Sequence, residues 1–117
     1  MDFDTLRTYC LSKAFTDESF PFGEDTLVFT VAGKLFALVD VVNAVSVNLK
    51  CEPEKALELR AQYPDDVLHG YHMNKKHWNT VVLKGRLGDE EICGLIDHSY
   101  EQVIKSLPKS KQKELGF

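Results

Sequence analysis

The residues best suited to bind a partner lie in one stretch, His69–Arg86, which reads HGYHMNKKHWNTVVLKGR and contains no acid. Its cations can neutralise phosphate groups, and an exposed aromatic ring beside them can stack on a nucleobase. The pattern therefore predicts a weak, salt-sensitive DNA site. The six residues expected to form it are Lys75, Lys76, His77, Trp78, Lys84 and Arg86.

The same residues also permit a structural interpretation. Large aromatic side chains are usually mostly buried, so Trp78 and Tyr71 are more commonly core residues than contact residues. A lysine pair such as Lys75–Lys76 more commonly makes a turn soluble. If the aromatic rings are exposed, a cluster of Tyr71, Met73 and Trp78 would equally suit a protein partner or a second copy of this chain. The exposure of Trp78 decides between core and contact.

The charge distribution restricts where an anionic partner could bind. The chain has 14 Lys and Arg against 18 Asp and Glu, a net charge of −4, which argues against strong non-specific binding to nucleic acid. Residues 1–66 carry 6 basic and 12 acidic side chains, a net of −6, whereas residues 67–117 carry 8 and 6, a net of +2. An anion is therefore expected only on the C-terminal half.

Metal binding and catalysis have weaker support. His69, His72 and His77 lack a paired cysteine or carboxylate, and their spacing matches no strong metal-site pattern. The run 97–99 contains Asp, His and Ser, but neighbouring residues of one helix point in different directions and cannot form a catalytic triad. Ser99 is expected to pack inward. We therefore predict no enzyme, no metal site and no cofactor.

The three cysteines, Cys10, Cys51 and Cys93, are odd in number and form no CxxC pair. This favours buried thiols in a reducing compartment over disulfides. Cys51, just before Pro53, could instead be a thiol of lowered pKa at a helix N-terminus, although a plain buried thiol is the commoner case. No apolar run is long enough to span a membrane and the N-terminus does not resemble a signal peptide, so we expect a cytoplasmic protein.

Hydrophobic periodicity predicts one α+β domain over residues 1–117, an antiparallel sheet flanked by helices in the order α-β-β-β-α-β-α. Residues 16–25 (TDESFPFGED) are expected to form a loop in which Phe20 and Phe22 anchor to the core. The expected elements are a first helix from Asp2 or Asp4 to about Ala14, strands Thr26–Val31, Leu35–Asp40, 45–50 and Trp78–Lys84, a second helix between Pro53 and Pro64, and a long helix from Asp89 to Leu107.

Several segments of the chain resemble the MmcQ/YjbR family. They are FPFGEDTLVF, GKLFAL, VNLKCEPE, QYPDD, GYHMNKKHWNTVVLKG, LIDHSYEQVI and SLPK, which together cover nearly the whole chain in the family order. One departure is Gly88, where the family pattern has proline. The resemblance implies a CyaY-like (frataxin-like) fold and a small cytoplasmic protein. It also implies the family's label of predicted DNA-binding protein, with a "double wing" suggested as the binding element.

Overall fold

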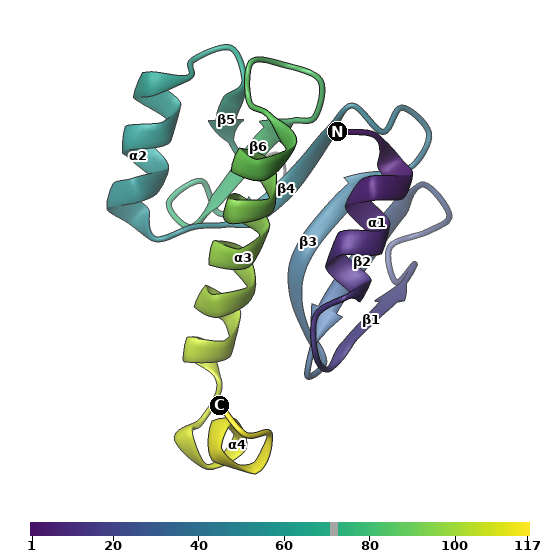
Figure 1. The fold of residues 1–117 in the computed structure, drawn as a ribbon, viewed down its shortest axis with the longest axis vertical. Helices are drawn as coiled ribbons and strands as arrows, with labels where there is room; N and C mark the ends of the chain where they lie inside the picture. The colour runs from purple at the N-terminus through teal and green to yellow at the C-terminus, as the bar shows by residue number, and fades with distance from the viewer. Residues whose placement is uncertain (71–72) are drawn as a thin grey trace.

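Short strands and helices follow one another in the order α-β-β-β-β-α-β-β-α-α (Figure 1). The structure is a computed structural model that describes residues 1–70 and 73–117. Within these residues the elements are α1 (Phe3–Leu11), β1 (Thr16–Ser19), β2 (Thr26–Val31), β3 (Lys34–Asp40), β4 (Ser46–Lys50), α2 (Pro53–Gln62), β5 (Val67–His69), β6 (Trp78–Val82), α3 (Asp89–Ser106) and α4 (Lys109–Glu114).

The strands form one sheet in the order β1-β2-β3-β4-β6-β5, and every neighbouring pair is antiparallel. A two-residue turn joins β2 to β3, with φ of 49° at Ala32 and 81° at Gly33. Positive φ at both positions is the geometry of a type I′ hairpin, whose twist matches that of the strands. The predicted α+β class with an antiparallel sheet is therefore confirmed.

The main core lies between the sheet and its helices. Alternate residues of β2, namely Leu27, Phe29 and Val31, are buried on this side because successive strand residues point to opposite faces. Helix α3 contributes Ile92 and Ile96, whose spacing of four places both on one side of the helix. In Figure 1, α1 and α3 lie in front of the strands, on the same face of the sheet.

Three short elements were not predicted, because none carries a hydrophobic period of its own. Strand β1, TDES, forms within the predicted loop by pairing with β2, with Asp17 opposite Thr30. Strand β5 has three residues and pairs with β6. Helix α4, KSKQKE, has no buried residue. The first helix also ends at Leu11, earlier than predicted. None of the helices in the described residues is both long and apolar enough to cross a membrane.

Candidate ligand site on the uncovered face of the sheet

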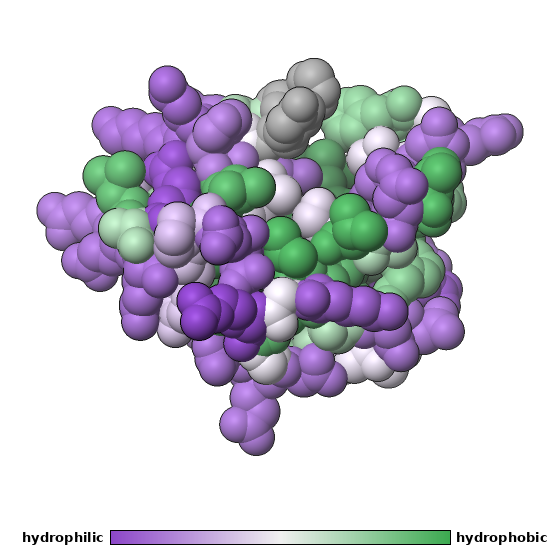
Figure 2. All heavy atoms as spheres, turned by 90° about the horizontal axis from the view of Figure 1, so that it is seen from above, coloured by the Kyte–Doolittle hydropathy of each residue, from purple (hydrophilic) through white to green (hydrophobic). Residues whose placement is uncertain are grey.

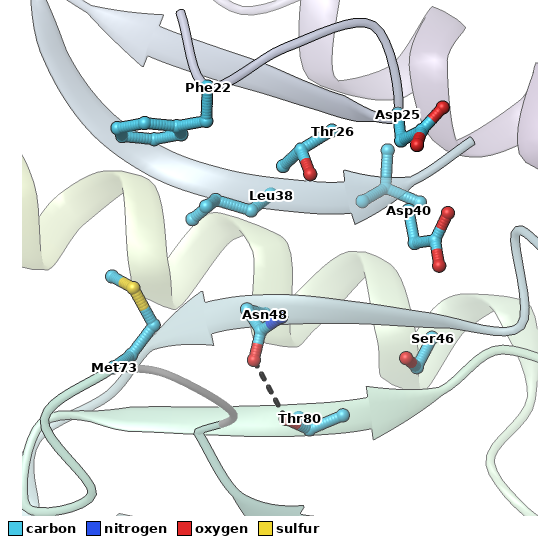
Figure 3. Close-up of a pocket in the computed structure, with 10 residues that line it drawn as sticks. Phe22, Asp25, Thr26, Leu38, Asp40, Ser46, Asn48, Met73 and Thr80 are labelled. Carbon is cyan, nitrogen blue, oxygen red and sulfur yellow. Dashed lines mark hydrogen bonds between the residues drawn. The ribbon is translucent and has the colours of Figure 1, made fainter. Parts of the chain in front are cut away.

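The second face of the sheet carries no helix in the described part of the chain. Its buried hydrophobic residues are Val28, Leu38 and Trp78, from β2, β3 and β6, and they form a cluster separate from the main core. Leu35 and Met73 pack against this cluster. Beside it lies a hollow of about 630 Å³ that crosses β2, β3, β4 and β6. Figure 3 views this hollow with the helices behind the strands.

One end of the hollow is apolar. Phe22 reaches over the sheet from the β1–β2 loop, Leu38 rises from β3, and Met73 lies across from them (Figure 3). Phe22 is 69% exposed and Phe20 is 49% exposed, so the prediction that both rings anchor to the core is wrong. The backbone turns at Gly23, whose φ of 113° suits glycine, and Phe22 lies on the uncovered face (Figure 3).

The other end of the hollow is acidic. Asp25 and Asp40 lie there beside Ser46 (Figure 3). The Asp40 carboxylate accepts hydrogen bonds from the Val42 backbone N–H at 2.9 Å and from Asn43 Nδ2 at 3.3 Å. The Asp25 carbonyl oxygen accepts from the Val41 N–H at 2.9 Å. These bonds hold the two acidic residues at one end of the β2–β3 ladder, where Asp40 is paired with Thr26.

Polar side chains from two strands cross the floor between these ends. Thr80 Oγ1 on β6 donates to Asn48 Oδ1 on β4 at 2.7 Å, and it also lies 3.1 Å from the His69 carbonyl oxygen. The sequence indicated this floor, because Ser46, Asn48 and Lys50 alternate with buried residues of β4, as predicted for a strand with one polar face. Sequence reasoning missed the two acids and Met73 as parts of one site.

The six residues predicted to bind DNA are divided by β6. Lys75 and Lys76 are exposed in the turn before this strand, and Lys84 and Arg86 are exposed in the loop after it. Strand β6 has five residues, which span about 16 Å at ~3.3 Å per residue. The predicted surface is therefore two small cationic groups at opposite ends of one strand. His77 is half-buried, and its carbonyl oxygen accepts the Cys51 N–H at 2.7 Å.

Trp78 is buried, with 9% of its surface exposed. The Gly70 N–H donates to the Trp78 carbonyl oxygen at 2.8 Å, and a Cβ at Gly70 would lie 2.7 Å from the Trp78 Cβ. A base could stack on this ring only if the residues packed against it moved away. The structure thus places Trp78 in a core cluster, the alternative that the sequence left open. Tyr71 and His72 lie outside the described residues.

The loop after β6 contains no acidic residue, but acidic side chains from other parts of the chain lie close to it. Asp66 is buried beneath it, and its carboxylate accepts the Arg86 backbone N–H at 3.2 Å. A Cβ at Gly85 would lie 2.1 Å from Asp66 Oδ1, so glycine is required for this approach. The pKa of Asp2 is lowered chiefly by its hydrogen bond from Thr5, with Lys84 as a weaker cause. Acids therefore offset the positive charge at this end.

The three side chains of the Asp-His-Ser run of α3 have different partners and do not contact one another in a catalytic line. Asp97 accepts from the Tyr9 hydroxyl at 2.7 Å and pairs with Lys13, and His98 Nε2 accepts the Glu52 N–H at 3.1 Å. Ser99 is buried; its Oγ donates to the Phe36 carbonyl oxygen at 2.5 Å and accepts the Lys50 N–H at 2.8 Å. The prediction that these residues form no triad and that Ser99 packs inward is confirmed.

The cysteines show no sign of activation. Burial raises the pKa of Cys51 to about 11 and that of Cys10 to about 12. The hypothesis of a helix N-terminal thiol of lowered pKa at Cys51 is therefore wrong, and the buried thiol is confirmed. All three cysteines are free. Among residues 1–70 and 73–117, no three His, Cys, Asp or Glu side chains are grouped as a metal site requires.

The far end of the molecule, at the top of Figure 1, is seen in Figure 2. On that side small hydrophobic areas are separated by hydrophilic side chains, and no single continuous apolar patch covers it. Stable protein interfaces have a fully buried apolar centre within a polar rim. This view therefore gives no particular support to the alternative of self-association through that end.

Comparison with known sequences relates the chain to proteins of similar length. A family model described as YjbR matches residues 11–102. The chain is 40% identical over 116 residues to the uncharacterized protein YjbR of Escherichia coli (strain K12), and the match covers 98% of each. It is 34% identical over 113 residues to the uncharacterized protein YbdF of Escherichia coli O157:H7, covering 96% of this chain and 92% of that protein.

Solved structures with similar folds support the same relationship. The crystal structure of Deinococcus radiodurans protein DR2400, family-model domain DUF419, matches with a TM-score of 0.93 and 38% identity, covering 99% of this chain and 88% of that one. The crystal structure of a protein from Pseudomonas syringae matches with a TM-score of 0.71 and 29% identity, covering 87% of this chain and 98% of that one.

Proposed function

We propose that this chain, which belongs to the YjbR family, is a non-enzymatic cytoplasmic module that binds a small ligand on the uncovered face of its sheet. The observation that carries the proposal is the hollow of about 630 Å³ beside Phe22, Leu38 and Met73. Ligand pockets commonly have volumes of roughly 300–1,000 Å³ and apolar walls with a few polar groups. The hollow has this size and this composition.

The exposure of Phe22 supports a binding role. A phenylalanine that is 69% exposed gains little from folding, because most of its apolar surface still contacts water. Met73 faces the same space, and its unbranched thioether side chain adapts readily to ligands of different shape. A ligand that covered both side chains would bury apolar surface that folding leaves in contact with water.

The lining favours binding over catalysis. Its titratable side chains in the described residues are Asp25 and Asp40, and neither histidine, cysteine nor lysine lines it. Among the described residues that line the hollow with Ser46 and Thr26, no histidine is present to accept a hydroxyl proton, as an activated nucleophile requires. The lining therefore supplies groups that orient a ligand and lacks the usual nucleophile–base pair.

A titration with a neutral aromatic probe tests this proposal. We expect 2-phenylethanol to shift the amide resonances of residues around Leu38, Asn48 and Met73 in two-dimensional NMR spectra of the labelled protein. Phe22→Ala should weaken binding about three- to tenfold, the effect of losing part of one aromatic contact. Phe20→Ala is the matched control, since Phe20 lies on the same loop, is half exposed and does not line the hollow.

The proposal is wrong if 2-phenylethanol leaves these resonances unchanged, or if Phe20→Ala weakens binding as much as Phe22→Ala. If the mass of the protein doubles as its concentration rises, and the same resonances shift with concentration without any probe, a second copy of the chain occupies this face. This result would favour the protein-interaction alternative over a ligand site.

Weak DNA binding is a second candidate, favoured by one observation at the turn before β6. Lys75 and Lys76 are exposed there, and no ion pair involves either lysine in the described residues. The Lys76 N–H donates to Asn74 Oδ1 at 2.9 Å, which shapes the turn. The cations are available for phosphate contacts, but the buried Trp78 adds no stacking, so binding would be electrostatic and weaken steeply with salt.

This candidate is tested by titrating single- and double-stranded DNA at low salt. Lys75→Ala/Lys76→Ala should weaken binding and flatten its salt dependence, because two phosphate contacts are lost. Lys109→Ala/Lys113→Ala changes the net charge equally at exposed positions of α4 and serves as the control. Equal effects of the two double variants would show that net charge alone is responsible, and the predicted DNA site at Lys75 and Lys76 would then be wrong.

A further inference from the structure

We infer that the hollow on the uncovered sheet face selects an organic cation, a molecule with an ammonium or guanidinium group attached to an apolar body. This inference rests on the proposed function and assigns the chemical class of the ligand. It follows from the separation of two kinds of side chain within one cavity. Phe22, Leu38 and Met73 lie at one end, and Asp25 and Asp40 lie at the other (Figure 3).

The charge of the lining has one sign. Two carboxylates line the hollow, and no lysine, arginine or histidine lines it in the described part of the chain. The nearest cation of β4 is Lys50, four residues along the strand from Ser46, which is about 13 Å at ~3.3 Å per residue. A cationic group at the acidic end is therefore attracted, whereas a phosphate or carboxylate would face like charge.

The rest of the protein reinforces this preference at longer range. Residues 1–66, which supply Phe22, Asp25 and Asp40, carry 6 basic and 12 acidic side chains. The summed field of such a segment favours the approach of cations and disfavours that of anions. The lysines of the DNA candidate, Lys75 and Lys76, follow Met73 in the turn before β6 and do not line the hollow.

The acidic end is held in place before any ligand arrives. Asp40 accepts two hydrogen bonds from the turn that follows it, at 2.9 Å from Val42 and 3.3 Å from Asn43. A carboxylate offers about four lone-pair sites, so these bonds leave acceptor capacity for a cation. The Asp25 backbone is tied to the same turn through Val41 at 2.9 Å. Less ordering on binding means that less of the interaction is lost to entropy.

The two ends suit one amphiphilic molecule better than two separate ligands. Thr26, Asn48 and Thr80 lie between the apolar and acidic ends, so a ligand that spans the hollow passes over hydroxyl and amide groups. Its apolar body packs against Phe22 and Met73. Because Asp25 and Asp40 are exposed, each contributes modestly, up to about fivefold in affinity, as water-exposed ion pairs do.

Three matched probes measure the selectivity: phenethylammonium, 2-phenylethanol and 3-phenylpropanoate, each titrated into the full chain at neutral pH and low salt. The ring and chain are similar, and the charge changes from positive to zero to negative. We expect phenethylammonium to bind about three- to tenfold more tightly than 2-phenylethanol, and 3-phenylpropanoate to bind more weakly than the alcohol. Added salt should reduce the advantage of the cation and leave the alcohol unaffected.

The variant Asp25→Asn/Asp40→Asn should remove the difference between the three probes. Asparagine keeps an oxygen that can accept the Val42 N–H, so the turn after β3 is preserved. Glu90→Gln/Glu91→Gln is the control, because it removes the same charge from exposed positions at the start of α3 and leaves the hollow unchanged. The control should retain the cation preference.

Each outcome has a distinct meaning. Equal binding of the three probes, weakened by Phe22→Ala, would overturn the cation inference and leave the proposed ligand site in place. Tighter binding of 3-phenylpropanoate would overturn the inference as well. Failure of all three probes to shift the residues around Leu38 would overturn both. Loss of selectivity in the Glu90/Glu91 control as well as in the Asp25/Asp40 variant would assign the preference to net charge and not to this site.

Discussion

The two faces of the sheet are made of the same strands but are buried by different means. On one face, helices α1 and α3 enclose a continuous core that includes Phe29 and Phe36, both fully buried. On the other face, Leu35 and Met73 pack against a small cluster around Trp78, and Phe22 remains 69% exposed. Helices therefore stabilise one face of this sheet, whereas the other leaves apolar surface in contact with water.

The largest expected effect comes from two phenylalanines on opposite faces. Phe36→Ala should lower the free energy of unfolding by about 3–5 kcal/mol, because it leaves a cavity in a packed core. Phe22→Ala should change it by less than about 0.5 kcal/mol, as most exposed substitutions do. Urea denaturation followed by circular dichroism measures both. Similar losses would mean that Phe22 stabilises the fold and is not held ready for a ligand.

The next effect concerns the cover of Trp78. Gly70→Ala should destabilise the protein by about 1–3 kcal/mol, because its Cβ would lie 2.7 Å from the Trp78 Cβ and 3.0 Å from its carbonyl oxygen. Trp78 is the single tryptophan, so its fluorescence reports the cluster directly, and a red shift is expected. Gly94→Ala, in α3 with no atom near the added Cβ, should instead stabilise by roughly 0.5–1 kcal/mol.

On the covered face, one buried hydroxyl joins helix to sheet. Ser99→Ala should cost about 1–2 kcal/mol, because it leaves the Lys50 N–H without its acceptor and the Phe36 carbonyl oxygen without its donor. Ser106→Ala removes only a hydrogen bond to Val103 within α3 and should cost less than about 0.5 kcal/mol. Equal losses in thermal or urea unfolding would contradict a role for Ser99 in docking α3.

The smallest effect is a pH dependence on the same face. In the folded protein the pKa of His98 lies below its ordinary value of 6.5, and burial is the main cause. Below about pH 6.5 the unfolded chain therefore binds more protons at this residue, so stability falls as pH decreases through this window. His98→Gln should flatten that part of the unfolding free energy against pH. An unchanged slope in the variant would show that His98 does not cause the dependence.

Much of the fold was predictable because it depends on local periodicity. The alternation in β2 and β4 and the three-and-four spacing in α3 predicted strands and helix at nearly their observed positions. The central place of β3 followed from its near-continuous apolar sequence. Strand β1 was missed because TDES becomes a strand only by pairing with β2, a contact that no local pattern records.

The candidate site was less predictable because its residues are brought together from distant parts of the chain. The sequence determined the family, the α+β class and the polar face of β4, each of which is written in contiguous segments. Only the tertiary structure decided that Trp78 is buried while Phe22 is exposed, since both are aromatic residues with charged residues nearby in the sequence. Burial depends on what packs against a side chain, and at Phe22 the helices lie on the opposite face of the sheet.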